Sequence, residues 1–314
     1  MLKFKKKGFI CSHESFKLDW FRKNTMVPIT YLIDSNRLRV FLGMCDDQNI
    51  GRVGYIDVNP DNPSEIIDYS KEPCLDIGSD GSFDDNGAIP SGILEEGGKL
   101  YMFYSGYQKV AKVPYLIFAG LAVSEDQGKT FKRLSSAPFL DRSHEELSIR
   151  AAVHCKKESD GYKLWYLGGS DWVRKGKGSQ IAPKYDIKYK FLEGDSILSI
   201  MKGFDDQVTS MSLSGDDEYG LSMPQVFEES GVYKMIYSIR TKSMGYRMGY
   251  AESVDNGKTW VRKDDQIELN VSDDGFDSQM VCFGHLQKVK SKTYMFYCGN
   301  DYGGSGIGYA ELIK

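Results

Sequence analysis

Long apolar runs and export signals are missing from this sequence. No window reaches the ~18 consecutive apolar residues that a membrane-spanning helix needs, so we expect no membrane span. The first ten residues carry several lysines, but no apolar stretch of the kind found in a signal peptide follows them. We therefore expect a soluble, cytoplasmic protein.

Closely spaced metal ligands and cofactor motifs are also missing. The six cysteines are scattered without a C-x-x-C pair, which favours reduced, buried thiols over disulfides. The four histidines form no ligand-spaced pair, so we expect no metal site. The glycine-rich segment 303–306 has neither the following helix nor the Gly-Lys-Ser/Thr end of a phosphate loop, and we expect no cofactor.

An excess of positive charge is absent as well. The 40 Lys and Arg against 44 Asp and Glu give a net charge of −4, which argues against nucleic acid as a partner. Only 9 residues are proline, while 41% are hydrophobic and 13% aromatic, which excludes a disordered chain. The aromatic load favours many strands, a surface that stacks on sugars, or both.

A short aromatic segment closed by a small residue recurs along the chain. Its copies are residues 38–43, 101–106, 164–168, 235–238 and 294–299. The aromatic residues at equivalent positions, separated by 63, 62, 71 and 60 residues, are Phe41, Tyr104, Tyr166, Tyr237 and Tyr297. Near-constant spacing indicates five structural repeats.

Each repeat contains two further strand-like segments. Those before the aromatic strands are residues 27–33, 88–94, 149–155, 222–227 and 280–286. Those after them are residues 54–56, 120–122, 188–190, 249–251 and 308–310. With turns between the segments and almost no helical periodicity, each unit is predicted to be a small antiparallel sheet.

Two turns share the pattern Ser-x-Asp-x-Gly-x-Thr-aromatic, at residues 124–131 and 253–260, and resemble the Asp box of propeller blades. Units of this length and content predict an all-β, five-bladed β-propeller of four-stranded antiparallel blades. The last unit ends after its third strand, so residues 3–10 are expected to supply its fourth strand and close the ring. We expect one domain, 1–314, with a β-sandwich as the alternative.

Carboxylates recur about 19 residues before the equivalent aromatic positions. The predicted catalytic residues are Asp85, Glu146 and Glu218. Cleavage of a glycosidic bond requires two carboxyl groups, one as acid and one as base or nucleophile. The alternative is that these acids cap turns or pair with Lys and Arg.

Further polar and aromatic residues are expected near the same mouth of the propeller. The predicted substrate-binding residues are Arg22, Lys23, Asp84, Arg150, Trp172, Gln225, Arg240, Asp277 and Gln279. Arginine forks suit an acidic sugar, inorganic phosphate or a nucleotide diphosphate. Trp172 lies in a polar insertion, 170–186, and together with Tyr107, Tyr185 and Tyr302 it is a candidate for contact with a glycan.

Residues 224–227, 246–253, 276–282 and 294–300 resemble the five-bladed propeller glycosidase superfamily. This superfamily includes arabinanases, β-xylosidases, invertases, levansucrases and mannoside phosphorylases. Residues 83–91 belong to the same pattern. More narrowly, the chain is similar over nearly its whole length to uncharacterised glycosidase-like proteins of bacterial surface-polysaccharide biosynthesis.

Two positions depart from the family pattern. Well-characterised members carry an Asp on the first inner strand, where residues 24–28 here have no acid and Asp19 is the nearest. Gln279 stands where the narrower group has an acid. Either the catalytic set is rearranged or this member is not a hydrolase.

The resemblance implies a carbohydrate-active enzyme that hydrolyses or transfers a glycosyl unit, in O-antigen or capsule metabolism. Its substrate would be a glycan, a sugar nucleotide or a lipid-linked sugar. A propeller that binds glycan without catalysis is the first alternative. A protein-interaction propeller, which would expose an apolar patch, is the second.

Overall fold

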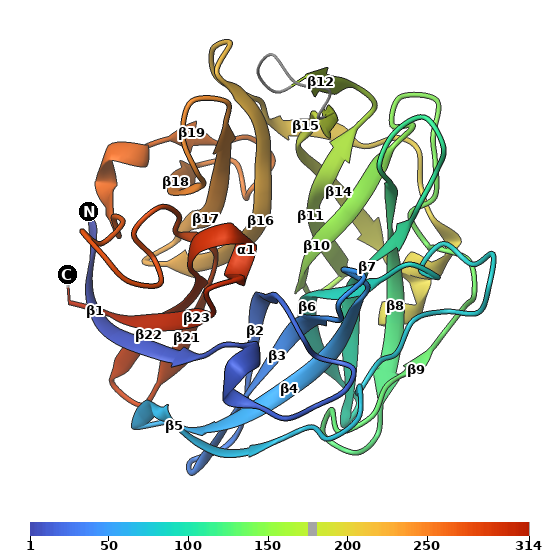
Figure 1. Ribbon diagram of the computed structural model, residues 1–314. Coiled ribbons are helices and arrows are strands. Elements are labelled where there is room, and N and C mark those ends of the chain that lie inside the picture. Colours follow the sequence, from blue (N-terminus) through green and yellow to red (C-terminus); the bar gives the residue numbers. More distant parts are fainter. Residues whose placement is uncertain (175–180, 314) are drawn as a thin grey trace.

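The computed structural model describes residues 1–174 and 181–313 and is built almost entirely of β-strands. Figure 1 shows its sheets arranged around a common centre. The only α-helical segment in these described ranges is the short α1 (Asn300–Gly303). Short 3-10 turns occupy His13–Ser15, Ile197–Lys202 and Asp264–Gln266. None of the helices in the described ranges is long and apolar enough to cross a membrane.

The first repeat forms a four-stranded antiparallel sheet in the order β2-β3-β4-β5. Its strands are β2 (Thr25–Asp34), β3 (Arg37–Cys45), β4 (Gly51–Asn59) and β5 (Asn62–Tyr69). The fourth repeat has the same arrangement, with strands β16 (Glu218–Glu229), β17 (Val232–Thr241), β18 (Arg247–Ser253) and β19 (Val261–Arg262).

The second and third repeats share one 8-stranded sheet rather than forming separate four-stranded sheets. The second contributes β6 (Ala88–Glu96), β7 (Lys99–Gln108), β8 (Leu116–Ser124) and β9 (Lys132–Arg133). The third contributes β10 (Ile149–Lys157), β11 (Gly161–Gly169), β14 (Asp186–Glu193) and β15 (Val208–Met211). A short parallel pairing of β10 with β8 joins the two groups. A two-stranded hairpin, β12 (Trp172–Arg174) and β13 (Ile181–Pro183), lies apart from this sheet.

The last repeat is completed by the N-terminal strand. Its five strands are β20 (Ile267–Glu268), β1 (Leu2–Cys11), β23 (Ile307–Leu312), β22 (Lys292–Cys298) and β21 (Cys282–Val289). β1 pairs antiparallel with β23 and parallel with β20, so this sheet has one strand more than expected. Figure 1 shows both termini at this sheet.

The strand pattern predicted from the repeats is confirmed. Every aromatic segment lies in the second strand of its group, where successive side chains on both faces of the sheet are buried. The equivalent aromatic residues Phe41, Tyr104, Tyr166, Tyr237 and Tyr297 are all fully buried. The aromatic content is therefore mainly packing, and all six cysteines are buried free thiols.

The two Asp-box turns fasten neighbouring repeats together. In the second turn, Ser253 Oγ accepts from Gly257 N at 2.9 Å and Asp255 Oδ1 accepts from Thr259 N at 2.9 Å. The carbonyl of Gly257 accepts a 2.7 Å hydrogen bond from Trp165 of the third repeat. In the first turn, the carbonyl of Gln127 accepts from Arg39 of the first repeat.

Candidate functional site

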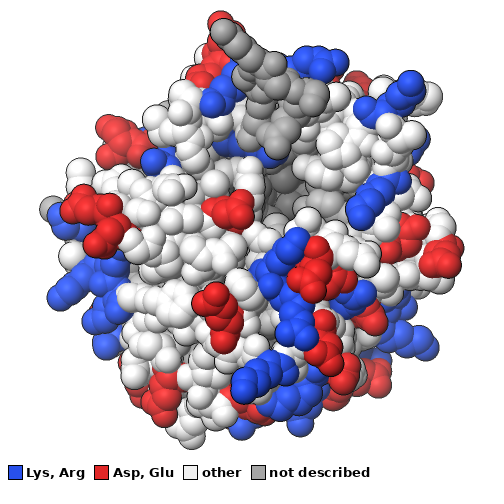
Figure 2. Space-filling view, in the orientation of Figure 1, with Lys and Arg blue, Asp and Glu red and all other residues white. Residues whose placement is uncertain are grey.

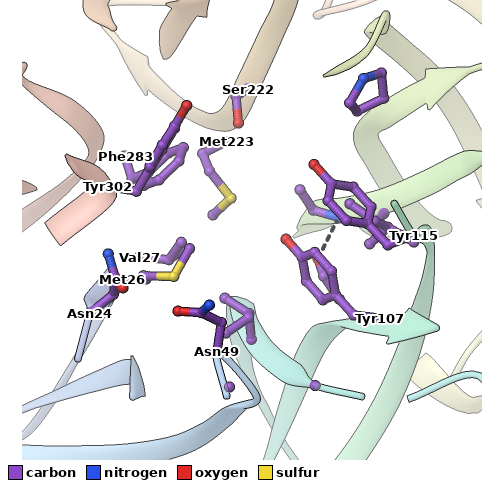
Figure 3. A pocket seen from close by; sticks show the side chains of 18 of the residues that line it. Asn24, Met26, Val27, Asn49, Tyr107, Tyr115, Ser222, Met223, Phe283 and Tyr302 are labelled. Carbon is purple, nitrogen blue, oxygen red and sulfur yellow. Dashed lines mark hydrogen bonds between the residues drawn. The ribbon is translucent and has the colours of Figure 1, made fainter. Parts of the chain in front are cut away.

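A cavity of about 690 Å³ lies where the first strands of all five repeats meet. Its wall includes these residues from β2, β6, β10, β16 and β21: Met26, Val27, Ile89, Pro90, Ile149, Ala151, Ala152, Ser222, Met223 and Phe283. Figure 3 shows Met26, Val27 and Phe283 across the opening from Tyr107 and Tyr115. The volume is in the range of small-molecule sites, about 300–1,000 Å³.

The cavity wall is strained in a repeated way. Val27, Ala152, Met223 and Phe283 are non-glycine residues with positive φ of 51°, 54°, 52° and 55°. Each lies at a β-bulge, where the pairing of a first strand with its second strand shifts register. β6 has its bulge between Pro90 and Gly92. Bulges re-aim side chains beside active sites, and left-handed backbone costs free energy, so this geometry marks the cavity as a functional candidate.

Five tyrosines are among the described residues that line the cavity: Tyr107, Tyr115, Tyr185, Tyr246 and Tyr302. Tyr107 packs edge-on against Tyr115 with ring centroids 5.5 Å apart, and Tyr246 packs against Tyr302 at 5.7 Å. The hydroxyls of Tyr185 and Tyr246 lie 3.1 Å apart and are hydrogen bonded. Figure 3 shows Tyr107 and Tyr115 on one side of the opening and Tyr302 on the other.

Tyr107, Tyr115 and Tyr246 stay protonated at neutral pH because burial raises the pKa of each phenol. Burial raises the pKa of Tyr115 to about 12, against the opposing effect of Arg240. Burial and the neighbouring Tyr185 raise the pKa of Tyr246 well above its usual value, and burial does the same for Tyr107. The hydroxyls therefore act as neutral donors and acceptors, as a sugar hydroxyl requires of its partners.

The charged groups among the described lining residues are few. They are Arg240 on β17, Lys109 after β7 and Asp301 in α1. Four amides, Asn24, Gln48, Asn49 and Asn86, also line the wall. Around the cavity, Figure 2 shows acidic and basic side chains interspersed over this face rather than gathered in one patch.

Glu146, a predicted catalytic residue, is buried and does not line the cavity. Its Oε2 accepts from the Tyr166 hydroxyl at 2.8 Å and lies 2.9 Å from Arg150 Nε. Burial raises the pKa of Glu146, although Tyr166 and Arg150 oppose the shift. Glu146 is therefore a counter-charge for Arg150 of β10, whose side chain is only 2% exposed.

The other two predicted catalytic residues also lie outside the lining. Glu218 forms a two-pronged ion pair with Arg262, with both N···O distances 2.7 Å. Asp85 accepts from Gly81 N at 3.0 Å through Oδ2, while its Oδ1 is buried without a hydrogen-bond partner. Its neighbours Asn86 and Gly87 do line the cavity.

Asp84 and Asp277, predicted to bind substrate, are buried in ion pairs. Asp84 pairs with Arg133 at 2.7 Å, and Asp277 pairs with Lys6 of β1 at 2.5 Å. Asp277 also accepts from the Tyr297 hydroxyl at 2.8 Å. Both carboxylates are thus occupied by the protein itself.

Of four remaining predicted binding residues, one lines the cavity and three do not. Arg240 lines the cavity. Arg22 pairs with exposed Asp19, and Lys23 donates to the carbonyl of Asp47. Gln225 exchanges hydrogen bonds with the backbone of Leu286 in the neighbouring sheet.

Trp172 and Gln279 lie outside the lining too. Trp172 donates to Ser148 Oγ at 3.2 Å and packs edge-on against Tyr115, so it supports the tyrosine wall from behind. Residues 175–180 of its insertion are outside the described residues. The exposed Gln279 is held through its backbone by Asn300 and Arg247.

The tyrosines named as glycan candidates are found at the cavity. Tyr107, Tyr185 and Tyr302 all line it. Tyr115 and Tyr246 were missed, because they follow loops whose length differs between repeats. In the described ranges, no group of three or more His, Cys, Asp or Glu side chains could hold a metal ion.

Comparison with known proteins shows which solved structures share this fold. No family model matches the chain. It is 28% identical over 298 residues to Rv1502, an uncharacterised protein of Mycobacterium tuberculosis, with 95% of each chain covered. A thermostable family-43 glycoside hydrolase superposes with a TM-score of 0.66 at 18% identity, covering 93% of this chain and 88% of the other.

A structure from a study of the GH130 family superposes with a TM-score of 0.67 at 15% identity, over 99% of this chain and 93% of the other. That study describes mannoside phosphorylases and glycoside hydrolases that target β-1,2 mannosidic linkages in Candida mannan. The chain is thus nearly all-β and has the fold of propeller-type glycoside hydrolases.

Proposed function

We propose that the protein is a carbohydrate-active protein that binds a sugar in the cavity between its tyrosines. The observation that carries this is the lining: ring faces of Tyr107, Tyr115 and Tyr302 beside neutral hydroxyls and amides. Aromatic faces stack on the apolar faces of sugars, and hydroxyls and amides pair with sugar hydroxyls in either hydrogen-bonding role. Among the described lining residues, Asp301 is the one carboxylate, which favours binding over double-carboxylate catalysis.

We also propose that the five repeats are blades of one propeller, closed by β1. Two observations support this. All five first strands contribute to the same cavity, and β1 pairs with β23 at the far end of the chain. The 8-stranded sheet is then two blades joined by the short β8–β10 pairing.

Glycosyl cleavage or transfer is the second candidate function. The buried, unpartnered Oδ1 of Asp85, next to two lining residues, favours it, because carboxyl groups left without a partner can be reserved for a substrate. The raised pKa of Glu146 is the property expected of a general acid. On this proposal Asp85 and Glu146 act on a sugar that reaches past the tyrosines, with Glu218 in support.

The biological setting is proposed from the sequence resemblance alone: a cytoplasmic role in surface-polysaccharide metabolism, on a glycan, sugar nucleotide or lipid-linked sugar. Deleting the gene in the source organism and comparing its surface glycans tests this. An altered glycan is the expected result, and an unchanged glycan contradicts the proposal.

Calorimetric titration with a panel of oligosaccharides and sugar nucleotides tests the binding function. We expect a bound sugar whose affinity falls at least tenfold in Tyr107→Leu and Tyr302→Leu. Tyr31→Leu is the matched control, because Tyr31 lies on β2 outside the cavity and donates to Glu95. Equal loss in the control, or no binding to any member of the panel, contradicts the proposal.

The same panel, with and without phosphate, tests catalysis. If the second candidate is correct, turnover of a bound sugar disappears in Asp85→Asn and Glu146→Gln while binding persists. Full activity in both variants excludes them as catalytic residues. Binding without turnover in the unmodified protein leaves the binding function standing and overturns the catalytic one.

A further inference from the structure

Arg240 has no carboxylate partner in the described part of the chain, unlike the fully buried Arg39 and Arg150. It lies on β17 and lines the cavity. Nη1 donates to the Tyr185 hydroxyl at a long 3.4 Å, and Nε is buried without a hydrogen-bond partner. Its guanidinium otherwise lies over the rings of Tyr219 and Tyr246, 4.7 and 5.6 Å from their centroids.

The contrast with four other arginines is direct. Arg39 pairs with Asp57 at 2.7 Å, Arg133 with Asp84 at 2.7 Å, Arg150 with Glu146 at 2.9 Å and Arg262 with Glu218 at 2.7 Å. In these four cases a carboxylate supplies the counter-charge of the arginine. At Arg240 the fold supplies tyrosine hydroxyls and ring faces instead.

No carboxylate in the described part of the chain pairs with this cation. The tyrosine hydroxyls around it offer hydrogen bonds rather than a counter-charge, and cation–π contacts attract the guanidinium without cancelling its charge. The described lining also contains Lys109, against the single exposed carboxylate of Asp301. The cavity therefore has an excess of positive charge although the chain as a whole carries −4.

We propose that Arg240 anchors an acidic group on the bound sugar, either the carboxylate of a uronic acid or the phosphate of a glycosyl phosphate. A guanidinium presents two parallel N–H donors that match the two oxygens of such an anion. The Tyr185 and Tyr246 hydroxyls lie 3.1 Å apart beside Arg240, and because one of them donates to the other, the pair has one O–H left to donate to the same group. This inference rests on the proposed sugar binding and adds the class of sugar.

The test compares acidic with neutral sugars. Calorimetric titrations use galacturonate and glucuronate oligosaccharides, glucose 1-phosphate and mannose 1-phosphate, and the neutral counterpart of each. We expect the acidic member to bind at least tenfold more tightly, and this preference to fall to about onefold in Arg240→Gln. Arg240→Lys keeps the charge and should retain part of the preference.

Arg247→Gln is the matched control. Arg247 lies on the neighbouring strand β18, donates to the carbonyls of Gly245, Tyr246 and Gln279, and does not line the cavity. The Arg247→Gln variant should prefer acidic sugars as strongly as the unmodified protein does. Thermal melts of all three variants check that they fold.

The outcomes separate this inference from the proposed function. If neutral and acidic sugars bind equally well, or if the preference for acidic sugars survives in Arg240→Gln, the acidic-sugar inference alone is overturned. A failure of every sugar to bind overturns the proposed function. Inorganic phosphate and acetate then probe the anion site by itself. Thermal stabilisation by these anions that depends on Arg240 supports the anion site, and the absence of any stabilisation overturns it. Preference for only one acidic series identifies carboxylate or phosphate as the group recognised.

Discussion

Tyr297 donates a 2.8 Å hydrogen bond from its hydroxyl to Oδ2 of Asp277, a residue 20 positions earlier in the chain. Tyr166 and Glu146 form the same bond at the same separation. In each case a cation also pairs with the carboxylate, Lys6 in one and Arg150 in the other. The tyrosine of a second strand thereby fixes the loop that precedes the first strand of its own repeat.

Loss of one of these carboxylates should cost stability. Glu146→Gln leaves the buried Arg150 with only the exposed Asp205, 3.2 Å away, as a charged partner, and we expect the free energy of unfolding to fall by about 3 kcal/mol. Urea denaturation measures this. Glu145→Gln is the control, because Glu145 is exposed and its neutralisation should change stability by less than about 0.5 kcal/mol. Equal effects of the two changes would contradict a structural role for Glu146.

The second Asp-box turn depends on Asp255. Partial burial raises the pKa of Asp255, but hydrogen bonds from Thr259, Ser253 and Lys258 outweigh this and lower it to about 2. Asp255→Ala should destabilise the protein by about 1–2 kcal/mol, as loss of a capping side chain does. Val254, 98% exposed in the same turn, provides the control, and Val254→Ala should be nearly neutral in the same thermal melts. If Asp255→Ala left the melting temperature unchanged, the turn would form without the Asp255 side chain.

Acid should destabilise the protein before its carboxylates titrate. Burial lowers the pKa of His154 to about 4 and that of His285 to about 3. The unfolded chain takes up protons near pH 6.5 while the folded chain does not, so stability is fully present above about pH 6.5 and falls as the pH drops toward 4. Because a little of each side chain stays accessible, the slope per histidine should be below the full ~1.4 kcal/mol per pH unit.

Urea midpoints between pH 7.5 and 4 measure this slope. His154→Gln should flatten it, whereas His144→Gln, at an exposed position, should leave it unchanged. A slope that is the same in all three proteins would refute the assignment to His154.

The strained backbone of the cavity wall can be tested with two adjacent alanines. Ala152 has a positive φ of 54°, whereas its neighbour Ala151 does not, and both side chains are buried. Glycine at 152 relieves left-handed strain of about 1–2 kcal/mol, which offsets the loss of a buried methyl. Glycine at 151 gives no such relief and adds backbone entropy to the unfolded chain.

We therefore expect Ala152→Gly to be at least about 1 kcal/mol more stable than Ala151→Gly in urea denaturation. The reverse order would show that the bulge is unstrained at this position.

The strands could be predicted from the sequence because their signals are local. The aromatic residues and the small residues that close each segment mark the second strands wherever they occur. The pairing of β1 with β23 could be predicted because the last repeat lacks a strand of its own. The joining of the second and third repeats through Ile149 and Arg150 leaves no comparable signal, since only two residue pairs make it.

The candidate site was harder to predict because the recurring carboxylates follow the repeat for a structural reason. Asp84, Glu146 and Asp277 sit at matching positions in ion pairs, two of them also bonded to the second-strand tyrosine. The cavity tyrosines break the repeat instead. Tyr115 precedes β8 and Tyr302 lies in α1, so no common spacing connects them.

The pairing of Phe4 with Leu312 has a consequence for synthesis of the chain. β1 is synthesised long before its antiparallel partner β23, so this strand must stay unpaired with β23 while the segments between them are translated. Such an exposed edge favours association between chains. Cells that make this protein in quantity should therefore depend on chaperones to keep its first ten residues apart until the final sheet can form.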